Sequence, residues 1–134
     1  MIVADVNTIA YFWIQGDKTR FAEQVIRKDP VWAVPLLWRS EFCNLMLGYV
    51  RRGEASMDDA LRTIRLAEDH LRATSYRIPS DRVMAVAAES DLSAYDCEYV
   101  ALAIELGVKL VTSDRQILRS FPVVAAKLED FAGG

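Results

Sequence analysis

Residues 93–114, SAYDCEYVALAIELGVKLVTSD, carry the clearest structural signal in this chain of 134 residues. Apolar positions with helical spacing predict a helix over 96–106, and Gly107 ends it, as glycine commonly does just after a helix. The apolar run 109–112 then predicts a buried strand that ends shortly before Asp114. A helix that leads directly into a buried strand is typical of a parallel sheet with helical crossovers.

The same alternation of helix and strand patterns extends over the rest of the chain. The expected strands are 1–5, 31–34, 75–78, 109–112 and 122–125, and the expected helices are 18–28, 37–52, 56–71, 79–87, 96–106 and 114–119, with a C-terminal turn through Leu128 and Phe131. We therefore expect an α/β fold with a parallel sheet covered by helices on both faces. The helical hairpin within 37–73 is larger than a simple crossover needs, so it is a candidate surface for a partner or a dimer.

Length and composition fit one domain over residues 1–134. Apolar residues make up 52% of the chain, which is enough to fill a single core. No apolar run approaches the ~18 residues of a membrane span. The N-terminus lacks the basic and then apolar pattern of a secretory signal. We therefore expect a cytoplasmic protein that does not associate with a membrane.

The cysteine and histidine content argues against a zinc site. Cys43 and Cys97 are scattered in the sequence, and a disulfide is not expected in a reducing compartment. His70 lies among charged residues and is expected on a solvated helix surface. The net charge of −3 argues against a surface covered by nucleic acid. It does not exclude a nuclease, because an acidic site that holds divalent metal becomes locally positive.

Four acidic residues lie where a parallel sheet would bring side chains together. Asp5 and Asp114 come at the ends of two strands, and Glu41 lies in the first turn of the helix that follows a third strand. Ligands of open parallel sheets bind outside the carboxyl ends of the strands, so we expect these three residues at one edge. Asp96 can join them if its helix begins at that edge, which the sequence does not fix.

Three of the four acids also have an ordinary structural explanation. Glu41 and Asp96 could favour the positive end of a helix dipole, and Asp114 could be an N-cap. Asp5 is harder to explain in this way because it ends a strand that should be buried. Clustered carboxylates at ~4 Å repel by roughly 1 kcal/mol per pair in water and by more inside a protein. Protonation or a cation must then stabilise them, and all-oxygen donors favour Mg²⁺ or Mn²⁺.

Four short segments resemble the motifs of PIN-domain nucleases, and in particular those of the VapC-type toxins. In chain order they are IVADVN at 2–7, SEFCN at 40–44, LSAYDCEYVALA at 92–103 and LVTSD at 110–114. The third segment is the most specific of the four. Because the ordered set spans nearly the whole chain, it is far more specific than any one segment.

This resemblance implies a three-layer α/β/α fold and RNA cleavage that depends on Mg²⁺ or Mn²⁺. It also implies a homodimer and a cognate antitoxin protein of a type II toxin–antitoxin module. The catalytic and metal-binding residues that it implies are Asp5, Glu41, Asp96 and Asp114, with Asn7 and Thr112 as supporting polar residues.

Other residues near these motifs have two interpretations. Arg39, Arg115 and Arg119 could contact RNA phosphates, to which arginine is suited, or could be solvated surface residues. Cys97 takes a position where the family often has a small residue, and we expect it to be a packing variant. Glu98 is expected to face elsewhere on its helix, on a solvated surface.

Two other functions fit parts of the pattern. The main alternative is a catalytically inactive module on the same fold that binds RNA or protein, although all four acids are present. A response-regulator receiver would need paired acids at the first strand, where only Asp5 occurs. With His70 alone no Ser-His-Asp arrangement is possible, and no Gly-rich loop indicates nucleotide binding.

Overall fold

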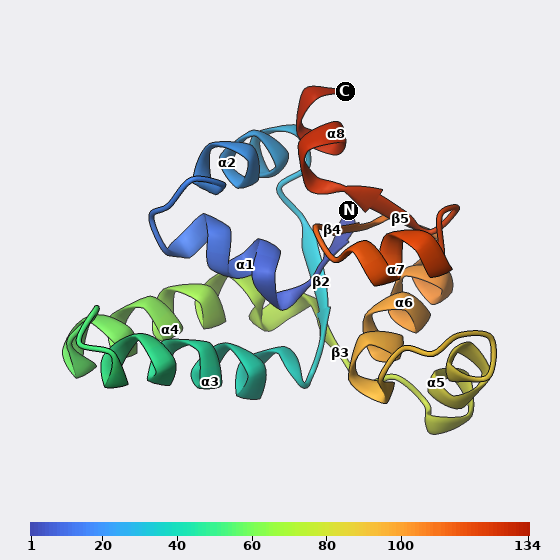
Figure 1. The fold of residues 1–134 in the computed structure, drawn as a ribbon, viewed down its shortest axis with the longest axis horizontal. Coiled ribbons are helices and arrows are strands. Elements are labelled where there is room, and N and C mark those ends of the chain that lie inside the picture. Colours follow the sequence, from blue (N-terminus) through green and yellow to red (C-terminus); the bar gives the residue numbers. More distant parts are fainter.

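The computed structural model describes all 134 residues, and its centre is a five-stranded parallel sheet (Figure 1). The strands are β1 (Ile2–Ala4), β2 (Trp32–Pro35), β3 (Ser75–Tyr76), β4 (Leu110–Thr112) and β5 (Ala125–Lys127). They lie in the order β3-β2-β1-β4-β5, and all four neighbouring pairs are parallel. Val3 of the central strand lies opposite Ala33 on one side and Leu110 on the other.

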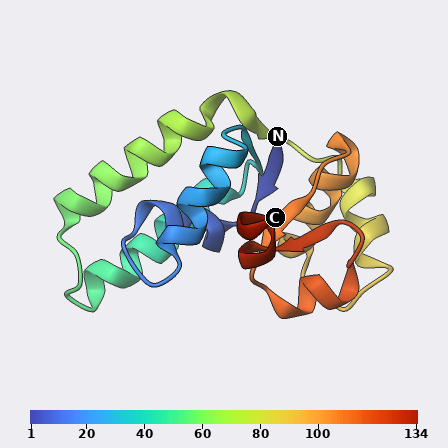
Figure 2. The same ribbon diagram turned by 90° about the horizontal axis from the view of Figure 1, so that it is seen from above.

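Helices cover both faces of this sheet, so the fold is a three-layer α/β/α arrangement (Figure 2). They are α1 (Val6–Trp13), α2 (Thr19–Lys28), α3 (Trp38–Arg51), α4 (Met57–Leu71), the 3₁₀ turn Arg72–Thr74, α5 (Ser80–Ala87), α6 (Ala94–Leu106), α7 (Arg115–Ser120) and α8 (Leu128–Gly133). Successive side chains of a strand point to opposite faces. Accordingly Ile2 and Ala4 pack in the core with α1 to α4 and α8, whereas Val3 packs in the core with α5 to α7.

The strand predicted over 122–125 begins three residues later in the structure, at Ala125. Residues 122–124 form a turn instead, in which the N–H groups of Val124 and Ala125 donate to the carbonyl of Phe121 at 3.2 and 2.8 Å. Pro122 has no N–H to contribute to a sheet, which favours the turn. The strand β5 starts only at Ala125, where the chain reaches Leu110 of β4.

Two further expectations need correction at the ends of elements. The strand expected over 75–78 is limited to Ser75 and Tyr76, and the chain then runs irregularly into α5. The expected C-terminal turn is a helix, α8, which packs against α2. Lys28 of α2 donates to the carbonyl of Phe131 at 3.0 Å. This contact between distant segments explains why the local pattern alone did not indicate a full helix.

His70 is not on a solvated surface, as the sequence suggests, but is half-buried among aromatic rings. Its ring centroid lies 5.6 Å from that of Trp32 and 6.4 Å from that of Trp13. Its Nε2 lies 3.3 Å from the carbonyl oxygen of Pro30. Charged neighbours on α4 face outward while this side chain turns toward the core.

Both cysteines are free, as expected. Cys97 is fully buried among apolar residues, which agrees with its interpretation as a packing variant. None of the helices combines the length and apolar character that crossing a membrane requires.

Candidate active site

Asp5 and Asp114 lie at the carboxyl ends of two adjacent strands, β1 and β4. Each is the N-cap of the helix that follows, because a short acceptor side chain satisfies the free N–H groups of a first turn. Asp5 Oδ1 accepts from the N–H of Thr8 at 2.9 Å. Asp114 Oδ1 accepts from the N–H groups of Gln116 and Ile117 at 2.9 and 3.0 Å. The parallel register therefore brings both carboxylates to one edge, as predicted.

Thr112 connects these two acids directly. Its hydroxyl donates to Asp5 Oδ2 and accepts from the N–H of Asp114 at 3.0 Å. Thr112 is fully buried and Asp5 is only 6% exposed. Thr8 adds a second link across the strands, because its hydroxyl donates to the carbonyl of Val111 at 3.1 Å. Thr112 therefore holds Asp5 Oδ2 and the backbone of Asp114 in fixed positions relative to each other.

Glu41 reaches the same region from the first turn of α3. The Tyr99 hydroxyl, on α6, donates to Glu41 Oε1 at 2.6 Å. Tyr99 is only 2% exposed, so the bond extends from the core to a half-buried carboxylate. The two helices lie in opposite layers of the fold, and this hydrogen bond joins them at the edge of the sheet.

Asp96 lies in the first turn of α6, near the other acids. Ser93 is the N-cap of this helix, and its Oγ accepts from the N–H of Asp96 at 3.1 Å. Burial first, and then the nearby charges of Asp114 and Asp5, raise the pKa of the Asp96 carboxyl. The helix therefore begins at the acidic edge, which is the orientation that the sequence left open.

Burial and mutual repulsion raise the pKa of three of these carboxyls. Desolvation is the largest cause of the raised pKa of Asp5, followed among the unfavourable effects by the charge of Asp114. Desolvation also leads for Glu41, where Asp96 and Asp5 contribute, although the Tyr99 hydrogen bond opposes the rise. The pKa of Asp96 is raised by desolvation first and then by Asp114. The ionised forms of these carboxyls are therefore less favourable in the protein than in water.

The donor chemistry of the cluster fits a hard divalent cation held partly through water. Glu41 Oε2 and Asp114 Oδ2 form no hydrogen bond within the protein, so they are free to accept from a hydrated ion. No group of three or more His, Cys, Asp or Glu side chains is close enough to form a ready metal cage. Mg²⁺ usually keeps several waters and binds through one or two carboxylates, and such a site needs no cage.

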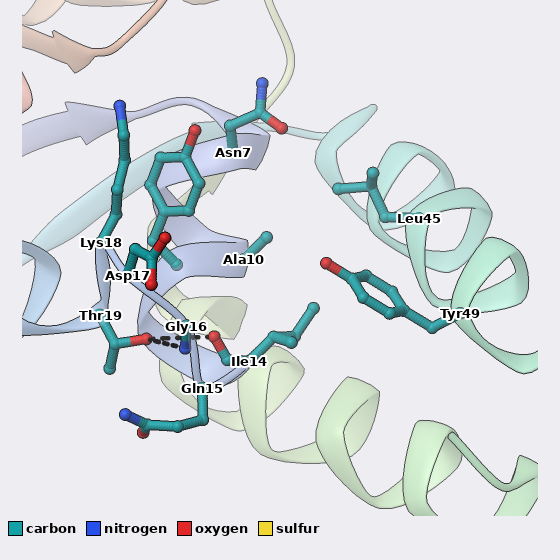
Figure 3. A pocket seen from close by; sticks show the side chains of 11 residues that line it. Asn7, Ala10, Ile14, Gln15, Gly16, Asp17, Lys18, Thr19, Leu45 and Tyr49 are labelled. Carbon is teal, nitrogen blue, oxygen red and sulfur yellow. Dashed lines mark hydrogen bonds between the residues drawn. The ribbon is translucent and has the colours of Figure 1, made fainter. Parts of the chain in front are cut away.

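Several residues that the sequence singled out lie outside the hydrogen-bonded cluster. Asn7 is exposed and makes no side-chain hydrogen bond, although it was a candidate supporting group. It lies at one end of a pocket that α1 forms with Leu45 and Tyr49 of α3 (Figure 3). Arg39 is exposed on the first turn of α3. Glu98 is half-buried instead of fully solvated, and its charge contributes to the raised pKa of Glu41.

Sequence reasoning missed Tyr99 as a polar member of the site. Most buried residues of α6 are apolar, so by residue type Tyr99 is indistinguishable from a core aromatic. The usable signal was its spacing, because a residue three positions after Asp96 lies on the same face of a helix. A tyrosine that is buried beside an acid usually finds a hydrogen-bond partner for its hydroxyl.

Comparison with known proteins shows the family of this chain. The PIN domain matches residues 2–122, which include every strand except β5 and all four clustered acids. The chain belongs to the PIN-domain family. Ribonuclease VapC3 of Pyrobaculum aerophilum is 28% identical over 126 residues, which cover 92% of this chain and 96% of that protein.

Solved structures of other proteins have the same fold. The crystal structure of PAE2754 from Pyrobaculum aerophilum superposes with a TM-score of 0.78 at 22% identity, over 98% of this chain and 93% of that one. A toxin–antitoxin complex from Klebsiella pneumoniae gives a TM-score of 0.68 at 21% identity, over 96% of this chain and 98% of that one. These likenesses confirm the predicted three-layer fold around a parallel sheet.

Proposed function

We propose that this PIN-domain protein is an endoribonuclease that depends on Mg²⁺ or Mn²⁺. The observation that carries the proposal is the cluster of carboxylates from Asp5, Glu41, Asp96 and Asp114 at one edge of the sheet, three of them with a raised pKa. A similar protein named as a ribonuclease supports RNA as the substrate.

The proposed roles follow from the contacts of each side chain. Asp5, Glu41, Asp96 and Asp114 would hold the metal directly or through water. A bound divalent cation would stabilise negative charge on the phosphoryl oxygens and lower the pKa of an attacking water. Thr112 orients Asp5 by its hydrogen bond. Tyr99 holds Oε1 of Glu41, which leaves Oε2 available for the metal or its water.

We also propose that the protein acts in the cytoplasm as the toxin of a type II toxin–antitoxin module. A toxin–antitoxin complex among the solved structures of the same fold supports a protein antitoxin as partner. The α3–α4 hairpin extends away from the sheet and offers a surface for that partner or for a second copy in a homodimer (Figure 1).

The alternative to cleavage is an inactive module on the same fold that binds RNA or protein. Cleavage of a labelled structured RNA with Mg²⁺, with Mn²⁺ and with EDTA distinguishes the two. The nuclease predicts metal-dependent cutting that Asp5→Ala abolishes and that Asp91→Asn, an exposed acid, retains.

The opposite result would be a folded wild-type protein that cuts no RNA with either metal. Calorimetric titration of the same sample with Mn²⁺ then gives the decision between the candidates. Absence of Mn²⁺ binding would reject the metal-dependent nuclease, because the proposed reaction requires a divalent cation at the four acids.

A further inference from the structure

A cleft of about 410 Å³ lies beside α7 and differs from the acidic cluster in its charge. Its walls come from the α1–α2 loop, the β4–α7 loop, α7, β5 and α8. Four cationic side chains line it, Lys18, Arg115, Arg119 and Lys127, against a single acid, Glu129. Such a concentration of positive charge is notable because the whole chain has a net charge of −3.

Most of these cations have no partner within the protein. Lys18 pairs with Glu129 at 3.3 Å, whereas Arg115, Arg119 and Lys127 form no ion pair and are exposed. Like charges held close together repel each other, so an arrangement of unpaired cations is stabilised by an anion from outside. The geometry of the cleft therefore points to an anionic ligand.

The cleft adjoins the acidic edge of the sheet. Ser113 lines it and directly precedes Asp114 in the chain. Lys18 lines both this cleft and the pocket that contains Asn7. Lys18 and Asn7 extend toward the same side of the α1 region (Figure 3). A polymer with its reacting phosphate at the carboxylates would pass into this cleft with its neighbouring phosphates.

We propose that this cleft binds the sugar–phosphate backbone of an RNA strand next to the phosphodiester that is cut. The proposal rests on the proposed nuclease function. It states that the RNA leaves the acidic site on the side of β4 and β5. Arginine forks bind phosphate oxygens in pairs. The cleft has only one apolar lining residue, Leu118, so a protein segment would find little to pack against. A nucleic-acid backbone needs charge and polar contacts and therefore suits these walls better.

The test compares two double variants that remove equal charge. Arg115→Gln/Arg119→Gln alters the cleft, and Arg51→Gln/Arg65→Gln alters exposed, unpaired arginines of the α3–α4 hairpin. Binding of a fluorescent single-stranded RNA is measured by anisotropy in EDTA over a series of salt concentrations. The cleft variant should bind RNA about tenfold more weakly. The negative slope of log association constant against log salt should become shallower by about 1.4, near 0.7 for each of the two lost phosphate contacts.

Each other outcome has a definite meaning. Equal binding by the cleft and hairpin variants would overturn the cleft while leaving RNA binding by the protein intact. Polyglutamate that binds the wild type more tightly than RNA does, and loses that binding in the cleft variant, would show a site for acidic protein and would also overturn it. Absence of RNA binding by the wild type would overturn the cleft, whereas the proposed nuclease is tested separately by the cleavage assay with metal.

Discussion

The Tyr99 hydroxyl donates to Glu41 Oε1 at 2.6 Å and thereby joins α6 to α3 at the carboxyl edge of the sheet. One partner is almost fully buried and the other is half-buried, so the bond passes from the core into the acidic cluster. It leaves Glu41 Oε2 without a partner in the protein. The same contact thus fixes the glutamate and leaves one of its oxygens available for a ligand.

Tyr99→Phe removes this donor without changing the aromatic ring. Loss of one hydrogen bond to a half-buried carboxylate should lower the free energy of unfolding by about 1 kcal/mol. The bond lowers the pKa of Glu41, so the variant should have a still higher pKa there, and the acid limb of the cleavage–pH profile should shift to higher pH. Tyr95→Phe, on an exposed side chain, is the control. Identical profiles for both variants would contradict the role of Tyr99.

Asp96→Asn tests the repulsion within the cluster. Burial, Asp114 and Asp5 raise the pKa of Asp96 above 3.8, so the folded state binds this proton more tightly than the unfolded state. The free energy of unfolding should therefore fall as pH rises through the interval between 3.8 and the raised pKa, and stay lower above it. Urea titrations in EDTA should show that the variant loses this fall and is more stable than the wild type at pH 7. A wild type that gains stability over the same interval relative to the variant would refute it.

The positions of Asp5 and Asp114 could be predicted from the sequence because both residues lie at the ends of strands. Asp5 and Asp114 follow short buried strands, and parallel pairing of these strands brings their ends together. The position of Asp96 depends instead on where α6 begins relative to the sheet, which is set by packing between layers. Tyr99 was missed because an aromatic residue on a buried helix face is usually part of the core.

The remaining errors have tertiary causes as well. Residues 122–124 are apolar enough for a strand, but Pro122 and the turn at Phe121 delay pairing until Ala125. His70 stands among charged neighbours, yet it packs against aromatic rings from α1 and β2 that lie far away in sequence. Local patterns carry no information about which distant rings will meet a side chain.

Thr112→Val removes the hydroxyl that joins Asp5 and Asp114 and keeps the shape of the side chain. It leaves Asp5 Oδ2 without its donor and the Asp114 N–H without its acceptor. We expect the free energy of unfolding to fall by about 2 kcal/mol, because buried polar groups lose their partners. RNA cleavage should also fall, since Asp5 is no longer oriented. Thr112→Ser keeps the hydroxyl and should retain cleavage, so equal activity of the two variants would contradict this role.

Mg²⁺ should stabilise the folded protein, because a cation relieves repulsion among the acids and binds only where they are assembled. Calorimetric unfolding scans should give a gain of about 2.7 kcal/mol when free Mg²⁺ is ~100 times its Kd. Glu41→Gln should lose most of this gain, since it removes a charged oxygen of the cluster. Glu89→Gln, an exposed acid just beyond α5, should keep it. An equal gain in both variants would mean that the ion binds elsewhere, and Glu41 would then have no part in holding it.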